Sequence, residues 1–513
     1  MQHEPTETSG FDRTLDAWLQ RLAASRAFSM ILIVLGAAFR LVQFLSGRSL
    51  WHDEATITLD VMDRSVGQLF QPSPLYGQTA PVGFLIGERI FGTLFHFTEA
   101  AMRAWPLVAG LLSLPLCYLL ARRILKPLGV QVALGLFAIS GPLIYYASEV
   151  KPYSGDVLFT LLLFWLGLKL LEPEPGHRWL VIAAIGGAIA LWFSHVAFFG
   201  ALSVGLVVVV PKLRRGRIHK LIPFLPVFAA WGISGLACYV LYLSRVSASH
   251  FLFNFWHEFF MPLPPKSTAD LFWFGRTFLE IFGYSAGLPA AGLAAFCAVI
   301  GAFSLGRRRG RVLALLLLPA LAALLLSGIG KYPFVGRLIL FLVPSALLLI
   351  GEGIDYLHQK IGAAGGTVVW VLLVLLALNP GVQALQHVKH PVVKADVRSA
   401  LELIAERAGR GDTIYLNYGS IRPYRYYERR GLNLHDVIIS DNPHDRWNWD
   451  VVQQDLAKLQ GHQRVWILFS GVWRDEHGNE KDLFLSEARR LGHESATWAF
   501  AGADVYLFDF SGN

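Results

Sequence analysis

The chain has 513 residues, of which 54% are hydrophobic and 16% charged, and its mean hydropathy is +0.46. Soluble proteins carry about a quarter charged residues, so this composition excludes an ordinary soluble globular protein. Several apolar runs reach the roughly 17–25 residues that cross a bilayer, which predicts a polytopic α-helical membrane protein. The net charge of +8 does not indicate nucleic-acid binding, because much of it lies in short loops between apolar runs.

The N-terminal segment 1–27 is polar, and no small-residue cleavage site follows the first apolar run, 28–45. We therefore expect a cytoplasmic tail followed by a retained transmembrane helix. The further expected spans are 102–120, 130–147, 157–171, 179–193, 196–210, 221–243, 286–305, 312–327, 338–350 and 367–378.

The apolar stretch 82–97 decides the topology, since counting it as a crossing gives about twelve spans instead of about eleven. With eleven spans, the basic loops "ARRILK", "PKLRRGRIHK" and "GRRRGR" all fall on the cytoplasmic side. If 82–97 crossed the membrane, "ARRILK" and every later loop would lie on the opposite side of the membrane. We therefore expect 82–97 to be an amphipathic interfacial helix in an outer loop, 46–101.

The segment 380–513 has the composition of a soluble domain and would follow the last span on the outer side. "DVRSALELIAERAGRGD" and "DLFLSEARRLG" have helical apolar spacing. "TIYLNYG", "RVWILFSG" and "ADVYLFDF" are strand-like. The expected fold is thus a helical membrane domain, 28–379, with a small extracytoplasmic α/β domain.

Asp53 and Glu54, in "WHDEATITLD", follow the first span directly. One interpretation is structural: Asp53 caps a short interfacial helix and Glu54 favours its positive end. The other is functional, because an ionisable side chain at a membrane edge is costly and marks a site. The residues by themselves leave both open.

A second acidic stretch, "YYASEVKPYSGD", carries Glu149, Lys151 and Asp156 in a short outer connection. Lys151 is either a snorkelling anchor or a functional cation. "KYPFVGR" sets Lys331 and Arg337 at the same side, where Arg337 is either an interfacial anchor or a group for bidentate phosphate binding.

"WHEFF" places His257 beside Glu258, a pair that could ligate a metal or simply pack at the interface.

Taken together, these stretches resemble the bacterial GT-C glycosyltransferases, in the branch of the protein O-mannosyltransferases and lipid A aminoarabinose transferases. The motifs are "LWHDEA", "APVGFLIGERIFG", "AMRAWPLVAGLLSLPLCYLLARRI", "YYASEVKPYSGDVL" and "KYPFVGRLILFLVP". The resemblance covers the chain up to about residue 350 and implies a GT-C-type membrane domain.

The resemblance implies transfer of a sugar from a polyprenyl-phosphate donor to an envelope acceptor, such as lipid A or core, a glycan, a lipid or a protein. Asp53 matches the family's first acidic position, the base, with Glu54 beside it. The second acidic position falls on Glu149 or Asp156. Some members place a divalent metal near the donor phosphate, and His257 and Glu258 are the nearest matches. We expect inversion at the anomeric carbon at the outer face of the bacterial inner membrane.

The cations suited to the leaving phosphate are Arg337, Lys151 and Lys331. A transporter or flippase of lipid-linked sugars is the alternative, but such proteins usually show repeated halves, and we find no repeat. A non-catalytic scaffold would leave the clustered charges unexplained.

Overall fold

The computed structural model describes residues 10–71, 78–246, 255–362, 365–440, 449–472, 474–475 and 478–511, which form two compact units. The first unit comprises Met1–Leu45, Val66–Glu88 and Arg103–Pro391. The second comprises Ser46–Ser65, Arg89–Met102 and Val392–Asn513. Two pieces of the expected outer loop therefore belong to the same unit as the C-terminal α/β fold, whereas the sequence assigned them to the membrane domain.

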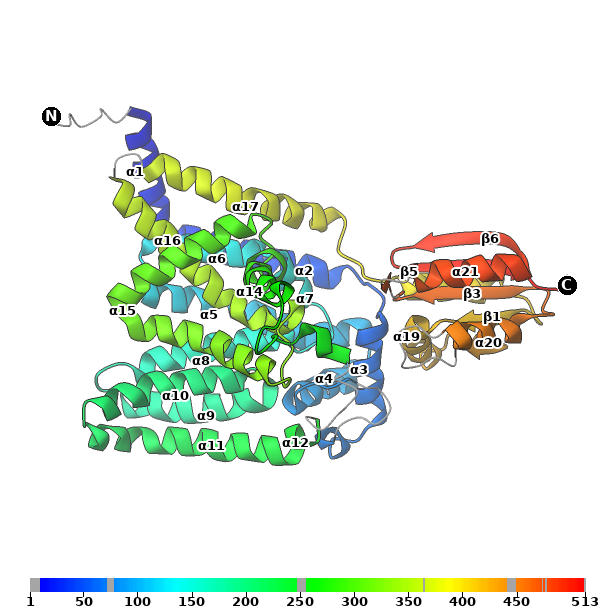
Figure 1. Ribbon diagram of the computed structural model, residues 1–513, viewed down its shortest axis with the longest axis horizontal. Helices are drawn as coiled ribbons and strands as arrows, with labels where there is room; N and C mark the ends of the chain where they lie inside the picture. The colour runs from blue at the N-terminus through cyan, green and yellow to red at the C-terminus, as the bar shows by residue number, and fades with distance from the viewer. Residues whose placement is uncertain are drawn as a thin grey trace. The chain divides into compact units, whose positions relative to one another are not determined.

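The first unit is helical, with short turns of 3₁₀ or π geometry at several helix ends (Figure 1). Helix α4 ends, and helix α5 begins, in the segment 89–102 of the second unit. The helices are α1 (Gly10–Ala24), α2 (Arg26–Leu45), α4 (Val82–Leu94), α5 (Glu99–Ile124), α6 (Pro127–Ile139), α7 (Gly141–Tyr146), α8 (Tyr153–Leu170), α9 (His177–Phe193), α10 (Ala197–Arg214), α11 (Leu225–Cys238), α12 (Ser244–Val246), α14 (Thr268–Glu280), α15 (Ala291–Gly328), α16 (Val343–Ile361) and α17 (Gly365–Lys389).

The polytopic membrane fold expected from the sequence is confirmed. Among the described residues, 8 helical segments are long and apolar enough to cross a membrane, and α6 and α9 are shorter apolar helices. The expected spans fall mainly on helices, with two differences in detail. The span 130–147 is broken at Ser140 into α6 and α7, because Pro142 has no N–H to continue the helix. Residues 291–305 and 312–327 of two expected spans are parts of α15 on either side of Arg309, where φ is −147° and ψ is 61°, whereas the expected residues 286–290 precede the helix.

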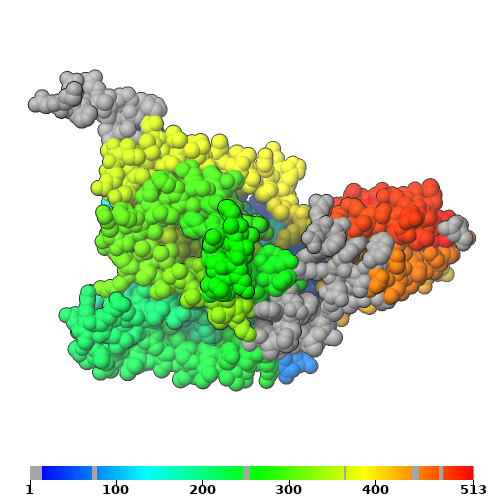
Figure 2. Space-filling view, in the orientation of Figure 1, coloured from blue at the N-terminus to red at the C-terminus, as the bar shows by residue number. Residues whose placement is uncertain are grey.

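The outer surface of the first unit is apolar, as a bilayer solvent requires. Figure 2 shows residues of α11, α15 and α17 on one face. The exposed side chains on these helices include Ile233, Leu236, Phe296, Val299, Phe303, Leu321, Leu325, Val371, Leu375 and Leu378. In a soluble protein such a surface would promote aggregation, whereas lipid tails cover it without penalty.

The second unit is an α/β fold built on a five-stranded sheet in the order β2-β1-β3-β7-β6. Strands β2, β1 and β3 are parallel, and β7 and β6 continue the sheet in the antiparallel direction. Its elements are α3 (His52–Asp63), α18 (Val397–Arg407), β1 (Thr413–Leu416), α19 (Tyr418–Glu428), β2 (Val437–Ile439), α20 (Trp449–Leu459), β3 (Val465–Ser470), β4 (Arg474–Asp475), β5 (Gly478–Asn479), α21 (Glu480–Leu491), β6 (His493–Phe500) and β7 (Ala503–Asp509).

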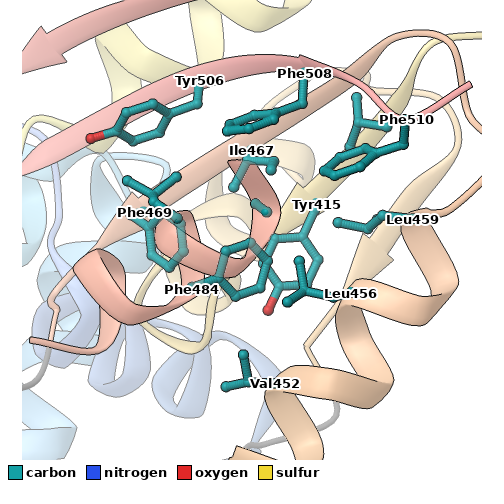
Figure 3. Packing of buried hydrophobic residues seen from close by; sticks show 13 residues of the cluster. Tyr415, Val452, Leu456, Leu459, Ile467, Phe469, Phe484, Tyr506, Phe508 and Phe510 are labelled. Carbon is teal, nitrogen blue, oxygen red and sulfur yellow. The ribbon is translucent and has the colours of Figure 1, made fainter. Parts of the chain in front are cut away.

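The core of this unit lies on the face of the sheet that α20 and α21 cover (Figure 3). The ring of Phe484 in α21 stacks on Tyr415 of β1 at 5.1 Å and meets Phe469 of β3 edge-on at 5.2 Å. All six residues of β3 are buried, as expected for a central strand covered on both faces. The three strands and two helices expected from the sequence are confirmed, and β2, β4, β5, β6, α19 and α20 are additional.

Candidate functional site

The acidic stretch between α7 and α8 is buried within the first unit. Glu149, Lys151 and Asp156 are respectively 0%, 6% and 7% exposed. The ammonium of Lys151 donates a 2.6 Å hydrogen bond to Oε1 of Gln78. A buried lysine with a protein partner is not a snorkelling anchor, which leaves the interpretation of Lys151 as a functional cation.

Tyr153 brings the second acidic stretch and the "KYPFVGR" segment together. The guanidinium of Arg337 lies 5.8 Å from the centre of the Tyr153 ring, within the range of a cation–π contact. The ring of Tyr153 meets that of Tyr146 edge-on at 5.2 Å. Tyr146 in turn interacts electrostatically with both Glu149 and Arg337. Glu149 and Arg337, which are far apart in the sequence, therefore both interact with the pair formed by Tyr146 and Tyr153.

Asp156 extends this arrangement on the first turn of α8. Its Oδ1 accepts a 2.6 Å hydrogen bond from the hydroxyl of Ser194, which is fully buried. Tyr332 interacts electrostatically with Asp156 and Tyr153, and its own hydroxyl donates to the carbonyl of Leu338 at 2.6 Å. We call the residues Tyr146, Glu149, Tyr153, Asp156, Ser194, Tyr332 and Arg337 the tyrosine cluster.

His195 adjoins the tyrosine cluster through its neighbour Ser194. Its ring stacks on Tyr242 at 5.9 Å. The side chain is half-buried as a whole, but its Nε2 atom is buried and has no hydrogen-bond partner among the described residues. Burial lowers the pKa of His195 to about 4, so the ring is neutral near pH 7.

The other candidates of the first unit lie at its surface. Lys331 is exposed, and His257 and Glu258 are exposed on a 3₁₀ turn, His257–Phe259. Within the described part of the chain, no group of three or more His, Cys, Asp or Glu side chains is arranged to hold a metal ion. Because a catalytic zinc needs three protein ligands, the pair His257 and Glu258 does not by itself fit a metal centre.

Asp53 and Glu54 lie in the first turn of α3, in the second unit. The N-cap residue is Trp51, so the expectation that Asp53 caps the helix is not met; Asp53 is one residue inside it. Its charge still favours the positive end of the helix dipole. Glu54 is 1% exposed, whereas Asp53 is half-buried and accessible in part.

Helix α3 packs on α19, which follows β1 in the C-terminal part of the unit. The imidazole of His52 lies 4.6 Å from the ring of Tyr418. Burial raises the pKa of Tyr418, the nearby Arg422 opposes that rise, and the charge of Asp53 adds to it. The candidate base therefore interacts with the phenol of Tyr418, which also interacts with the guanidinium of Arg422, and the sequence patterns singled out neither residue.

A buried hydrogen-bond network holds the segment before α3 on the C-terminal part of the unit. The Tyr427 hydroxyl accepts a 3.0 Å bond from the Leu50 N–H and donates to the carboxylate of Glu99. Arg398 binds the same carboxylate at 2.6 Å. Ser49 Oγ donates to the Ala395 carbonyl at 2.7 Å. These bonds fix the backbone three residues before Asp53.

Replacing Tyr427 by Phe removes the acceptor of the buried Leu50 N–H, which costs about 1–3 kcal/mol locally. We expect faster hydrogen exchange in peptides covering 46–65, measured by mass spectrometry on the detergent-solubilised protein. Tyr424→Phe is the control, because the Tyr424 hydroxyl bonds to Glu428 within α19. Equal exchange in both variants would show that Tyr427 does not hold this segment.

The neutral His195 makes stability depend on pH, since its pKa is lowered in the folded state and about 6.5 when unfolded. The unfolded chain binds more protons between these values, so this stabilisation is complete above about pH 6.5 and is lost toward pH 4. We expect His195→Phe to lose less thermal stability than the wild type between pH 7.5 and 5, measured by the unfolding midpoint. His219→Phe, which alters an exposed histidine, is the control. Matching pH profiles for wild type and His195→Phe would refute the assignment.

Comparison with known proteins gives a family match for one segment and a similar fold for the chain. Residues 78–238, which contain Glu149, Lys151 and Asp156, match the family described as dolichyl-phosphate-mannose-protein mannosyltransferase. No curated protein matches the chain.

The structure is similar to that of ArnT from Cupriavidus metallidurans bound to undecaprenyl phosphate, with a TM-score of 0.54, 14% identity, and 94% of this chain and 98% of that chain covered. It is also similar to the oligosaccharyltransferase AglB from Archaeoglobus fulgidus in complex with an inhibitory peptide and a dolichol-phosphate (TM-score 0.52, 13% identity, 93% and 74% covered). An oligosaccharyltransferase structure from the same organism, tethered to an acceptor peptide, gives a TM-score of 0.53 at 12% identity, with 87% and 69% covered. These likenesses confirm the expected GT-C fold.

Proposed function

Because the chain has the GT-C fold and carries a mannosyltransferase-family segment, we propose that it transfers a sugar from a polyprenyl-phosphate donor to an acceptor of the cell envelope. The observation that carries the proposal is the tyrosine cluster. Burying Glu149 and Asp156 in an apolar helical unit, beside the half-buried Arg337, is costly, and such groups are kept where they perform chemistry. The polyprenyl phosphates bound to ArnT and AglB support this class of donor.

In the proposed reaction, the acceptor hydroxyl attacks the anomeric carbon directly. A bond forms between the acceptor oxygen and the anomeric carbon while the bond from that carbon to the donor phosphate oxygen breaks. Asp53 accepts the proton of the attacking hydroxyl, a role typically worth about 10²–10⁴-fold in rate. The electron pair leaves with the polyprenyl phosphate, and the product has inverted configuration.

The leaving phosphate gains charge and needs a cation to stabilise it. We assign this role to Arg337, whose planar guanidinium can hold two phosphate oxygens and whose orientation Tyr153 supports. Lys151 is the second cation, placed by its bond to Gln78, and Lys331 is a peripheral third. Glu149 and Asp156 remain the candidates for the second acidic residue. Asp156 has a fixed partner in Ser194, while Glu149 acts on Tyr146, as does Arg337.

The proposed location is the outer face of a bacterial inner membrane, with the N-terminus cytoplasmic and the α/β unit outside. The distribution of basic loops supports this orientation, since short cytoplasmic loops hold the excess of Lys and Arg. Acceptors in this compartment include lipid A and its core, other glycans, lipids and proteins.

We expect Asp53→Asn to lower transfer by at least about 100-fold, because an amide cannot accept the proton. The measurement is mass spectrometry of envelope lipids and glycans from cells that lack the gene and express each variant. Asp63→Asn, at the other end of α3, is the matched control and should restore the wild-type product. Near-normal product with Asp53→Asn, at equal protein level in the membrane, would exclude Asp53 as the base.

Direct displacement also fixes the stereochemistry. The product linkage should have the anomeric configuration opposite to that of the donor, assigned from NMR coupling constants of the isolated product. A retained configuration would require a covalent or otherwise two-step route and would remove Asp53 from the base role.

A further inference from the structure

We propose that Tyr418 and Arg422 of α19 are acceptor-binding residues that act beside Asp53, and that the acceptor they hold is a sugar of an envelope glycan or glycolipid. The inference rests on the proposed function, because it takes Asp53 as the base. It assigns to the C-terminal part of the chain a direct role in binding the substrate.

The two residues share one face of α19. Tyr418 is the first residue of the helix and Arg422 follows four residues later, so their side chains are neighbours on the helix surface. The face carrying Tyr418 meets α3 through the contact between the His52 and Tyr418 rings, at 4.6 Å and with an angle of 41° between their planes. Asp53 is adjacent to His52 in the chain and interacts electrostatically with Tyr418.

The face of α19 that carries Tyr418 and Arg422 is not the one that packs into the interior of the unit. The side chains that attach α19 to its unit are Ile421, Tyr424, Tyr426 and Tyr427, which are buried. Tyr418 and Arg422 are instead half-buried, as are His52 and Asp53. Asp53 and Arg422 thus both interact with Tyr418 at a partly accessible position, and the network around Tyr427 and Glu99 holds the segment before α3 there.

These groups suit a hydroxylated ring. The Tyr418 hydroxyl carries its proton at neutral pH, as an ordinary phenol does, and burial raises its pKa further, so it can donate to an acceptor oxygen. The Arg422 guanidinium offers several N–H donors in a fixed plane and can bind two oxygens at once. The imidazole and phenol rings supply an apolar surface for the C–H face of a sugar. The acceptor hydroxyl next to those oxygens would then face Asp53.

The test measures sugar transfer by the purified full-length protein in proteoliposomes. Membranes of the deletion strain supply the donor, and a glycan and glycolipid extract of its envelope, at varied concentration, supplies the acceptor. We expect Arg422→Gln to raise the extract concentration for half-maximal rate by about 10-fold or more, the effect of one lost charged hydrogen bond. Tyr418→Phe should raise it about 5-fold, as expected for one neutral hydrogen bond. Arg422→Lys should recover part of the loss, since it keeps the charge and loses the planar donors.

Tyr424→Phe and Arg425→Gln are matched controls on the same helix, since both native side chains bond to Glu428. They should leave the half-maximal concentration unchanged within about 2-fold, and all variants should unfold at the wild-type temperature. If Tyr418→Phe and Arg422→Gln behave as the controls while Asp53→Asn is inactive, the inference fails and the proposed function stands. If Asp53→Asn is itself active, the proposed base fails first. Transfer found only on envelope protein, and not on the extract, would overturn the glycan acceptor.

Discussion

The cost of holding charged and polar groups in an apolar surrounding governs the first unit. Its helices present aliphatic and aromatic side chains outward, yet Glu149 and Lys151, just before α8, and Asp156, in its first turn, are buried. Each of these groups must be offset by a local partner, because an unpaired charge in a low dielectric is strongly unfavourable. Gln78 serves Lys151 and Ser194 serves Asp156. The tyrosines around them add hydrogen-bonding hydroxyls and ring faces that tolerate a neighbouring cation.

The cost of leaving a buried polar group without a partner also explains the hydrogen-bond network of the second unit. The Tyr427 hydroxyl satisfies a backbone N–H and a carboxylate at once, and Arg398 balances the charge of that carboxylate. This buried network ties Ser46–Ser65 and Arg89–Met102 into the α/β fold. As a result, the sheet of the C-terminal part is more than an appended module: it is the support on which α3, and with it Asp53, is held. A support of this kind positions a side chain more precisely than a loop can.

The proposed function draws on a cation in the first unit and a carboxylate in the second. A reaction that generates a charged lipid phosphate and removes a proton from a hydroxyl needs a fixed cation and a fixed carboxylate, each placed before the substrate arrives. The ring of Tyr153 orients Arg337, and the first turn of α3 presents Asp53. The partial exposure of Asp53, set against the full burial of Glu54, separates the neighbouring carboxylates into one that can meet a substrate and one that is internal.

The amino-acid sequence by itself determined the membrane class, the helical segments, the α/β nature of the C-terminal part and the acidic and basic stretches of interest. These properties are local: apolar length, strand alternation and charge in short loops are written in consecutive residues. Only the tertiary structure decided that Glu149 and Arg337 meet at a tyrosine pair, that Lys151 is buried and that Ser194 partners Asp156. It also decided that α3 packs on α19, so that Tyr418 interacts with both Asp53 and Arg422. Such contacts join residues that are far apart in the chain. The packing of whole helices determines which hydroxyl or guanidinium contacts a given carboxylate, and the local sequence pattern does not contain that information.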